Sequence, residues 1–172
     1  KKILPVIIAV LLILVIGGVT LGKVLLDKYS YSKEEADWNE FYQVSETDRS
    51  AIILQDEMVE EQALIRDGVC YFDLATVHKY MNEVFYADMT ENLLLYATPT
   101  EVIRTVFGET SYNTTEGMQD AGFVISFVEG DTVYVAADYV KLFTNYSYEC
   151  YDRHVQVYTE WGTRQVAQLK KD

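Results

Sequence analysis

Basic side chains are scarce in this chain of 172 residues, because 14 Lys and Arg stand against 27 Asp and Glu. From residue 29 onward there are 26 acidic and 10 basic side chains, a net charge of −16. Nucleic acids and anionic lipid headgroups are bound by basic surfaces. The composition therefore excludes nucleic acid as a partner and argues against docking on anionic lipid. It suits a soluble domain that is repelled by an anionic surface.

Histidine is equally scarce, with only His78 and His154. Both fall outside the apolar pattern of their segments, so we expect both to face solvent. A nucleophilic triad therefore has little to be built from, and the chain contains no G-x-S-x-G motif and no phosphate-binding glycine loop. A pair of carboxylates of the glycosidase type stays open on composition alone, because 27 acids offer many pairs.

Two cysteines, Cys70 and Cys150, leave two alternatives open. Outside the cytoplasm they can form a disulfide that closes a loop of about 80 residues and contributes about 4 kcal/mol. They can equally be two buried free thiols.

Charge is absent altogether from residues 3–22, whose sequence is ILPVIIAVLLILVIGGVTLG. Twenty helical residues span about 30 Å, the thickness of a bilayer core, so we predict one transmembrane helix. The run exceeds the apolar core of a signal peptide, which favours an uncleaved signal anchor. Lys1 and Lys2 precede it, so the positive-inside rule predicts a cytoplasmic N-terminus. Lys23 and Lys28 on the other side weaken that prediction, but the size and acidity of the following domain restore it, which places the C-terminal domain outside, at the cell membrane.

The remainder predicts an α+β fold dominated by antiparallel strands. We expect residues 1–28 to hold the cytoplasmic start and the anchor, and residues 29–50 to be a linker. Within the linker, Ser32 to Glu35 fit a capping box that starts a short helix carrying Trp38 and Phe41. Short apolar runs bounded by turns follow, with helices near 74–81 and 137–144.

An internal repeat organises these elements, because residues 67–96 align with residues 130–158. The matched pairs include Tyr71 with Tyr134, Val77 with Val140, Tyr80 with Phe143, Asn82 with Asn145, and Phe85 with Tyr148. Each asparagine follows a helix, where a left-handed residue commonly ends one. We therefore predict two related βαββ-type units, at 51–108 and 109–172, that pack together because neither has enough core alone.

Four segments stand out by their order: YSYSKEEADWNEFY (29–42), AIILQDEMVEEQALIRDGVCYFDLATVHKYMN (51–82), ENLLLYATPTEVI (91–103) and Trp161-Gly162. These segments resemble the N-terminal region of clostridial membrane-anchored family-18 glycoside hydrolases, which contains a copper-amine-oxidase N-terminal-like stalk domain. In that family a signal anchor and this double module are often followed by a small wall-binding β-barrel and a chitinase-like catalytic barrel. The catalytic DxxDxDxE motif is absent from this chain, so we expect no enzyme activity from it. The chain looks like the N-terminal portion of such an enzyme or a relative without the enzyme.

The resemblance does not imply a copper site, because copper needs several imidazole or Cys/His/Met ligands and the family uses this module as a stalk. Two acidic clusters could attract calcium, but neither has EF-hand spacing, and we expect solvated charge. Their members are Asp56, Glu57, Glu60 and Glu61 in one cluster, and Glu129 and Asp131 in the other. We expect no cofactor and no metal.

Aromatic residues are plentiful, with fourteen Tyr, seven Phe and two Trp. Most are expected to pack in strands. If exposed rings bind glycan, Tyr112, Tyr158 and Trp161 are the first candidates. The function we predict is a non-catalytic extracytoplasmic stalk or interaction module of a Gram-positive, cell-wall-associated protein. The alternative is a surface module that binds peptidoglycan or a protein through exposed aromatic side chains.

Overall fold

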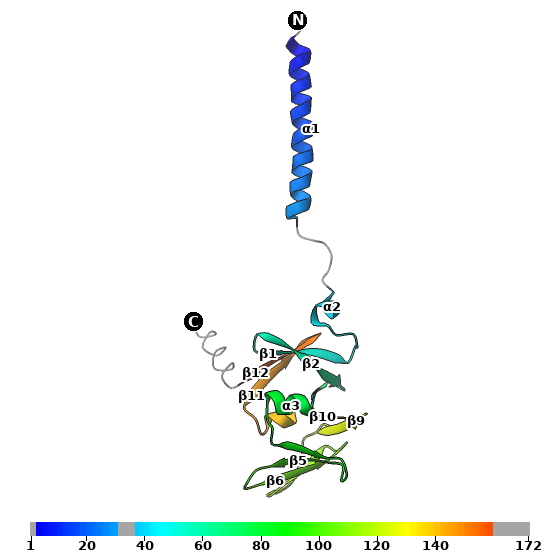
Figure 1. The fold of residues 1–172 in the computed structure, drawn as a ribbon, viewed down its shortest axis with the longest axis vertical. Helices are drawn as coiled ribbons and strands as arrows, with labels where there is room; N and C mark the ends of the chain where they lie inside the picture. Colours follow the sequence, from blue (N-terminus) through cyan, green and yellow to red (C-terminus); the bar gives the residue numbers. More distant parts are fainter. Residues whose placement is uncertain (1–2, 31–36, 160–172) are drawn as a thin grey trace. The chain divides into compact units, whose positions relative to one another are not determined.

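The computed structural model describes residues 3–30 and 37–159, and the chain divides into two compact units. The first unit covers Lys1–Ala36 and the second covers Asp37–Asp172 (Figure 1). Each unit has its own structure and is described by itself.

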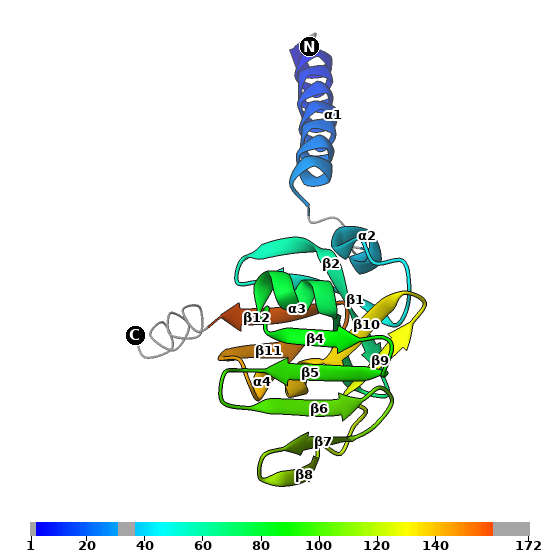
Figure 2. The same cartoon turned by 60° about the horizontal axis from the view of Figure 1, so that its bottom comes forward.

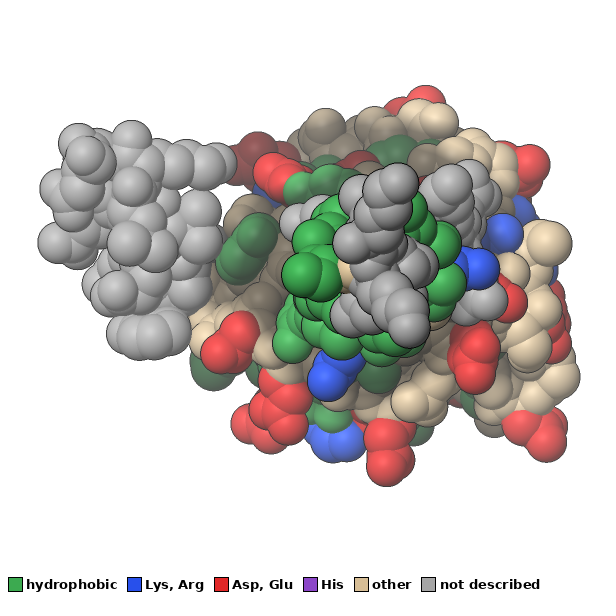
Figure 3. Space-filling view, turned by 90° about the horizontal axis from the view of Figure 1, so that it is seen from above, with side chains coloured by type: hydrophobic (Ala, Val, Ile, Leu, Met, Phe, Trp, Pro, Cys, Tyr) green, Lys and Arg blue, Asp and Glu red, His purple; other side chains and the backbone are tan. Residues whose placement is uncertain are grey.

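The N-terminal unit is the helix α1 (Ile3–Tyr29). Its 27 residues correspond to about 40 Å of helix. Apolar side chains are exposed along it, and Figure 3 shows them in green. Among the described residues, α1 is the one helix long and apolar enough to cross a membrane. It continues beyond the predicted span 3–22 and ends with Lys28 in its last turn, where a cation favours the helix dipole.

A short helix, α2 (Trp38–Tyr42), opens the second unit. The Asp37 carboxylate caps it by accepting hydrogen bonds from the backbone N–H of Asn39 at 2.9 Å and Glu40 at 3.4 Å. The predicted capping box at 32–35 lies outside the described residues. The expected helix around Trp38 and Phe41 is present, with Asp37 as its cap.

A seven-stranded sheet forms the larger layer of the second unit, in the order β11-β12-β1-β2-β3-β10-β9. All neighbouring strands are antiparallel except β1 and β12, which run parallel. Its strands are β1 (Arg49–Leu54), β2 (Glu57–Arg66), β3 (Val69–Asp73), β9 (Ser126–Glu129), β10 (Thr132–Ala136), β11 (Tyr146–Cys150) and β12 (His154–Thr159). The parallel pair joins the first and the last described strand of this unit.

A five-stranded antiparallel sheet follows the chain order β4-β5-β6-β7-β8, and Figure 2 shows its strands side by side. Its strands are β4 (Phe85–Asp88), β5 (Leu93–Ala97), β6 (Val102–Val106), β7 (Ser111–Thr114) and β8 (Gly117–Asp120). Two short helices, α3 (Leu74–Tyr80) and α4 (Ala137–Lys141), lie at the predicted positions.

Side chains from α3, α4 and both sheets pack together in the hydrophobic core. Val77 of α3 and Val140 of α4 are fully buried, as is Phe72 of β3. Phe85 of β4 is 1% exposed, and its ring centroid lies 6.2 Å from that of Tyr139 in α4. Burial of each such side chain contributes about 1.5–3 kcal/mol, so this cluster is the main source of stability.

The order strand, helix, strand, strand occurs twice, as β3-α3-β4-β5 and as β10-α4-β11-β12. The leading strands β3 and β10 pair with each other in the seven-stranded sheet. Beyond the helices the two segments diverge, since β4 and β5 enter the five-stranded sheet whereas β11 and β12 stay in the seven-stranded one. The predicted boundary after residue 108 falls between β6 and β7, which are paired strands of one sheet.

The expectation of left-handed asparagines after the two helices is wrong. Among the described residues other than glycine, the positive-φ positions are Gln43, Gln55, Asp67 and Asn92. Asn82 instead uses its side chain: the amide nitrogen donates to Phe143 O at 3.3 Å and Thr144 Oγ1 at 3.0 Å. Its amide oxygen accepts from Val84 N at 2.9 Å. Asn82 thus links the ends of α3 and α4, a contact that needs its side chain rather than a special backbone.

Candidate functional site

Aromatic side chains from two distant segments line a pocket of about 280 Å³. The lining residues are Trp38, Tyr42, Tyr151, Asp152, Arg153 and His154. We call this the aromatic pocket. It lies wholly within the second unit, between α2 and the turn that connects β11 to β12.

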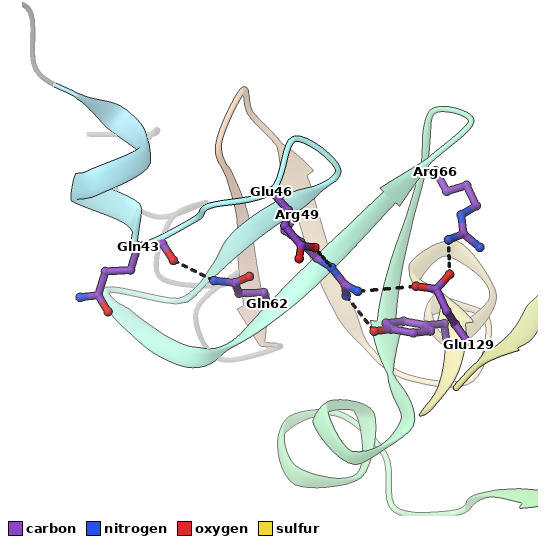
Figure 4. A network of polar contacts seen from close by, with 7 residues as sticks. Gln43, Glu46, Arg49, Gln62, Arg66 and Glu129 are labelled. Carbon is purple, nitrogen blue, oxygen red and sulfur yellow. Dashed lines mark hydrogen bonds and ion pairs between the residues drawn. The ribbon is translucent and has the colours of Figure 1, made fainter. Parts of the chain in front are cut away.

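Local contacts hold both walls of the pocket in place. Gln62 Nε2 of β2 donates to Gln43 O at 3.0 Å, which fixes the end of α2 (Figure 4). Val44, the next residue, is 2% exposed and secures the chain to the core. On the other wall, Ala51 N donates to Arg153 O at 3.0 Å and Tyr151 N donates to His154 O at 2.8 Å. The parallel pairing of β1 with β12 therefore brings the two walls together.

Four rings of the pocket form a column of nearly parallel planes. The Tyr151 and His154 centroids are 4.7 Å apart with planes 12° apart, and His154 and Tyr42 are 4.8 Å apart at 23°. Trp38 continues the column at 6.2 Å and 24° from Tyr42. Such distances are typical of offset stacking. Trp38 is 56% exposed and Tyr151 is 50% exposed, so the ends of the column are open to a ligand.

The polar groups of the pocket complement the rings. Neither the Asp152 carboxylate nor the Arg153 guanidinium has a side-chain hydrogen bond or ion pair to another residue in the part of the chain that the structure describes. Burial lowers the pKa of His154 below its ordinary value, so its imidazole is mainly uncharged at neutral pH. The pocket thus offers one anionic acceptor, one cationic donor and neutral ring faces.

Of the predicted glycan-stacking residues, neither Tyr112 nor Tyr158 lines this pocket. Tyr112 of β7 packs against Tyr139 at 5.3 Å, and Tyr158 lies half-buried on β12 in the other sheet. Trp161 lies outside the described residues. The structure therefore does not bring Tyr112 and Tyr158 into one binding face.

The expectation that both histidines face solvent holds for His78 and is wrong for His154. His78 is exposed, and its Nε2 lies 2.5 Å from Phe85 O. His154 is half-buried between Tyr42 and Tyr151, because parallel pairing with β1 carries it beneath α2. The spacing of Trp38 and Tyr42 at i and i+4 on a helix indicates that the two rings share a face. Nothing in the local sequence indicates that Tyr151 and His154 meet them.

The two cysteines meet across the core, although 79 residues separate them in the sequence. Both thiols are free in the structure, Cys70 buried on β3 and Cys150 exposed at the end of β11. A hydrogen bond between them lowers the pKa of Cys150 and, with burial, raises the pKa of Cys70. The alternative of two buried free thiols is therefore wrong for Cys150, which is exposed, and an added oxidant is needed to convert the neighbouring thiols to a disulfide.

Members of both acidic clusters are engaged by cations. Glu61 accepts from Lys79 Nζ at 2.6 Å and from Tyr80 OH at 2.9 Å, and its pKa is lowered chiefly by the Lys79 contact. Glu129 pairs with Arg66 and lies 3.8 Å from Arg49 (Figure 4). No group of three or more His, Cys, Asp or Glu side chains that could hold a metal occurs within residues 3–30 and 37–159.

Comparisons of the chain with protein-family models, with curated proteins and with solved structures find no match.

Proposed function

We propose that this chain is a single-pass membrane protein whose second unit is displayed outside the cytoplasm as a non-catalytic stalk or interaction module. The observation that carries the proposal is α1, a 27-residue helix whose apolar side chains are exposed. Exposed apolar surface of this extent is unfavourable in water and favourable in a bilayer. The helix is therefore the anchor of the protein.

The distribution of charge supports an N-terminus in the cytoplasm and a second unit outside it. Lys1 and Lys2 precede the anchor, and the residues from 29 onward carry a net charge of −16. Basic residues beside an anchor are retained on the cytoplasmic side, so Lys1 and Lys2 favour this orientation, whereas Lys23 and Lys28 on the other side oppose it. The size and acidity of the part that follows decide in favour of export. Acidic side chains are spread over the face seen in Figure 3 and keep this unit from adhering to anionic lipid.

The order strand, helix, strand, strand, present twice in the second unit, supports two related βαββ-type units. Such a duplicated module is what the resemblance to the N-terminal region of membrane-anchored family-18 glycoside hydrolases implies. In that setting its role is geometric: it holds a cell-wall-active partner or domain at a set distance and orientation from the membrane.

Membrane fractionation and protease accessibility test this proposal. The full-length product should stay in the membrane pellet after carbonate extraction. Protease added to intact protoplasts should digest the second unit, whereas a cytoplasmic control protein stays intact. Recovery of the uncleaved chain in the soluble fraction, or protection of the second unit in intact protoplasts, contradicts the proposal.

A second candidate function, binding of peptidoglycan or a surface protein, is favoured by the aromatic pocket. Retention of the protein on purified wall sacculi, lost on Trp38→Ala, separates a binder from a passive stalk. Equal recovery with and without sacculi supports the passive stalk.

A further inference from the structure

We propose that the aromatic pocket is a binding site for an extended neutral oligosaccharide, different sugar units of which contact the exposed rings of Tyr151 and Trp38 at the two ends of the stack. This proposal rests on the proposed function, because that function places the pocket where extracellular glycan is available. It adds the site and the chemical class of its ligand.

Charge narrows the class of ligand. The residues from 29 onward carry −16, and Asp152 lies in the pocket wall, so an anionic ligand is repelled. A cation would be attracted by aromatic rings and by the surrounding acids, but Arg153 lines the same pocket and opposes it. The remaining class is neutral.

The hydrogen-bonding groups of the pocket narrow the class of ligand further. Asp152 offers only acceptors and Arg153 only donors, and both side chains are unengaged by the described residues. A hydroxyl group can donate to the first and accept from the second. A ligand rich in hydroxyl groups therefore satisfies both, whereas an apolar ligand leaves both charges without partners.

Ring geometry completes the inference. In the column, the rings of His154 and Tyr42 are each stacked between two neighbouring rings. The terminal residues Tyr151 and Trp38 are about half exposed. A pyranose ring has an apolar C–H face that covers such a flat surface and a hydroxyl rim that reaches the polar groups. The inner stack holds the rings in place, so little side-chain freedom is lost on binding.

Binding is tested with the full chain in phosphatidylcholine nanodiscs, using Trp161→Phe as background so that Trp38 is the sole tryptophan of the chain. The probes are the tetramers of N-acetylglucosamine and of glucose, with choline and a sulfated saccharide for comparison. We expect a saturable change in Trp38 fluorescence with at least one neutral tetramer. Truncating Tyr151 to alanine should weaken that binding about tenfold, the usual cost of losing an aromatic anchor.

The matched control is Tyr86→Ala, which removes a tyrosine of comparable exposure, 60% against 50% for Tyr151, from β4 and should leave affinity unchanged. A second variant, Arg153→Gln, removes the donor without removing a ring and should also weaken binding. Absence of any saturable response to both tetramers overturns the assignment, as does tighter binding of choline or the sulfated saccharide. Unchanged affinity in Tyr151→Ala and Arg153→Gln overturns it too. Orientation does not affect a nanodisc titration, so failure here leaves the protease result of the proposed function intact.

Discussion

Oxidation of the two cysteines should stabilise the second unit strongly. Cys150 is the exposed thiol with the lowered pKa, so its thiolate attacks an added disulfide such as oxidised glutathione. This releases one reduced glutathione and leaves a mixed disulfide on Cys150. Cys70, hydrogen-bonded to it, then displaces the second glutathione as its proton is lost. The product is a disulfide between β3 and β11 at the expense of one oxidised glutathione.

The magnitude follows from the loop that this bond closes. A loop of about 80 residues loses about 15 cal/mol/K of unfolded-state entropy, which corresponds to about 4.5 kcal/mol at 25 °C. With a urea m-value of about 2 kcal/mol/M, the midpoint of unfolding should rise by about 2 M. A strained bond would give less.

The assay is urea unfolding of the full chain in nanodiscs, with and without reductant, after thiol counting by mass spectrometry. Cys150→Ser is the control, because it keeps Cys70 buried and removes the bond, so reductant should not change its midpoint. The reasoning is refuted if the oxidised wild type keeps two free thiols. It is refuted equally if its midpoint matches that of Cys150→Ser under oxidising conditions.

Three further predictions concern packing and charge. Asn82→Ala should lower the free energy of unfolding by about 1–2 kcal/mol, because it removes the link between the ends of α3 and α4. The control Asn145→Ala, at the exposed repeat partner, should change that free energy by less than about 0.5 kcal/mol. Equal effects of the two substitutions in urea unfolding would contradict this prediction. Phe85→Ala should lower the free energy of unfolding by about 3–5 kcal/mol in the same assay, since this residue is 1% exposed. A decrease below about 1 kcal/mol would show that the two sheets do not share this core. The Glu61 pair with Lys79 contributes stability above the ordinary carboxyl pKa and loses it as pH falls through the lowered pKa. Glu61→Gln should therefore lower the free energy of unfolding by about 0.5–1 kcal/mol at pH 7, and the difference should shrink as the pH falls through that lowered pKa; a pH-independent difference would refute the assignment.

Local signals in the sequence predicted the elements that depend on local chemistry. The uncharged run lies within α1. Asp67-Gly68, a dipeptide typical of two-residue hairpins, joins β2 to β3 with both residues at positive φ. The helices near 74–81 and 137–144 lie where the apolar periodicity placed them, although α4 ends earlier at Lys141.

The hairpin of β7 and β8 was missed, because its residues lack the alternation that marks a half-buried strand. All four residues of β8 (Gly117–Asp120) are exposed, so its formation depends on backbone pairing with β7. In the apolar run 123–128 the strand begins only at Ser126, and β2 extends back through the acidic residues 57–61. In these segments backbone hydrogen bonds with neighbouring strands override the side-chain pattern.

The aromatic pocket could not be predicted, because its two walls lie more than 100 residues apart in the sequence. Their meeting depends on one parallel pairing, in which Ala51 lies opposite His154. Side-chain patterns report which face of a strand is buried but not which distant strand is its neighbour. The candidates chosen from composition, Tyr112 and Tyr158, consequently lie in different sheets.

The parallel pairing of β1 with β12 has a mechanical consequence. If tension enters at the start of β1 and leaves at the end of β12, the two strands are pulled lengthwise past each other. The hydrogen bonds of that pair, from Ala51 to Leu54, then bear the load together instead of opening one after another. A domain loaded in this way resists extension until the whole ladder yields at once.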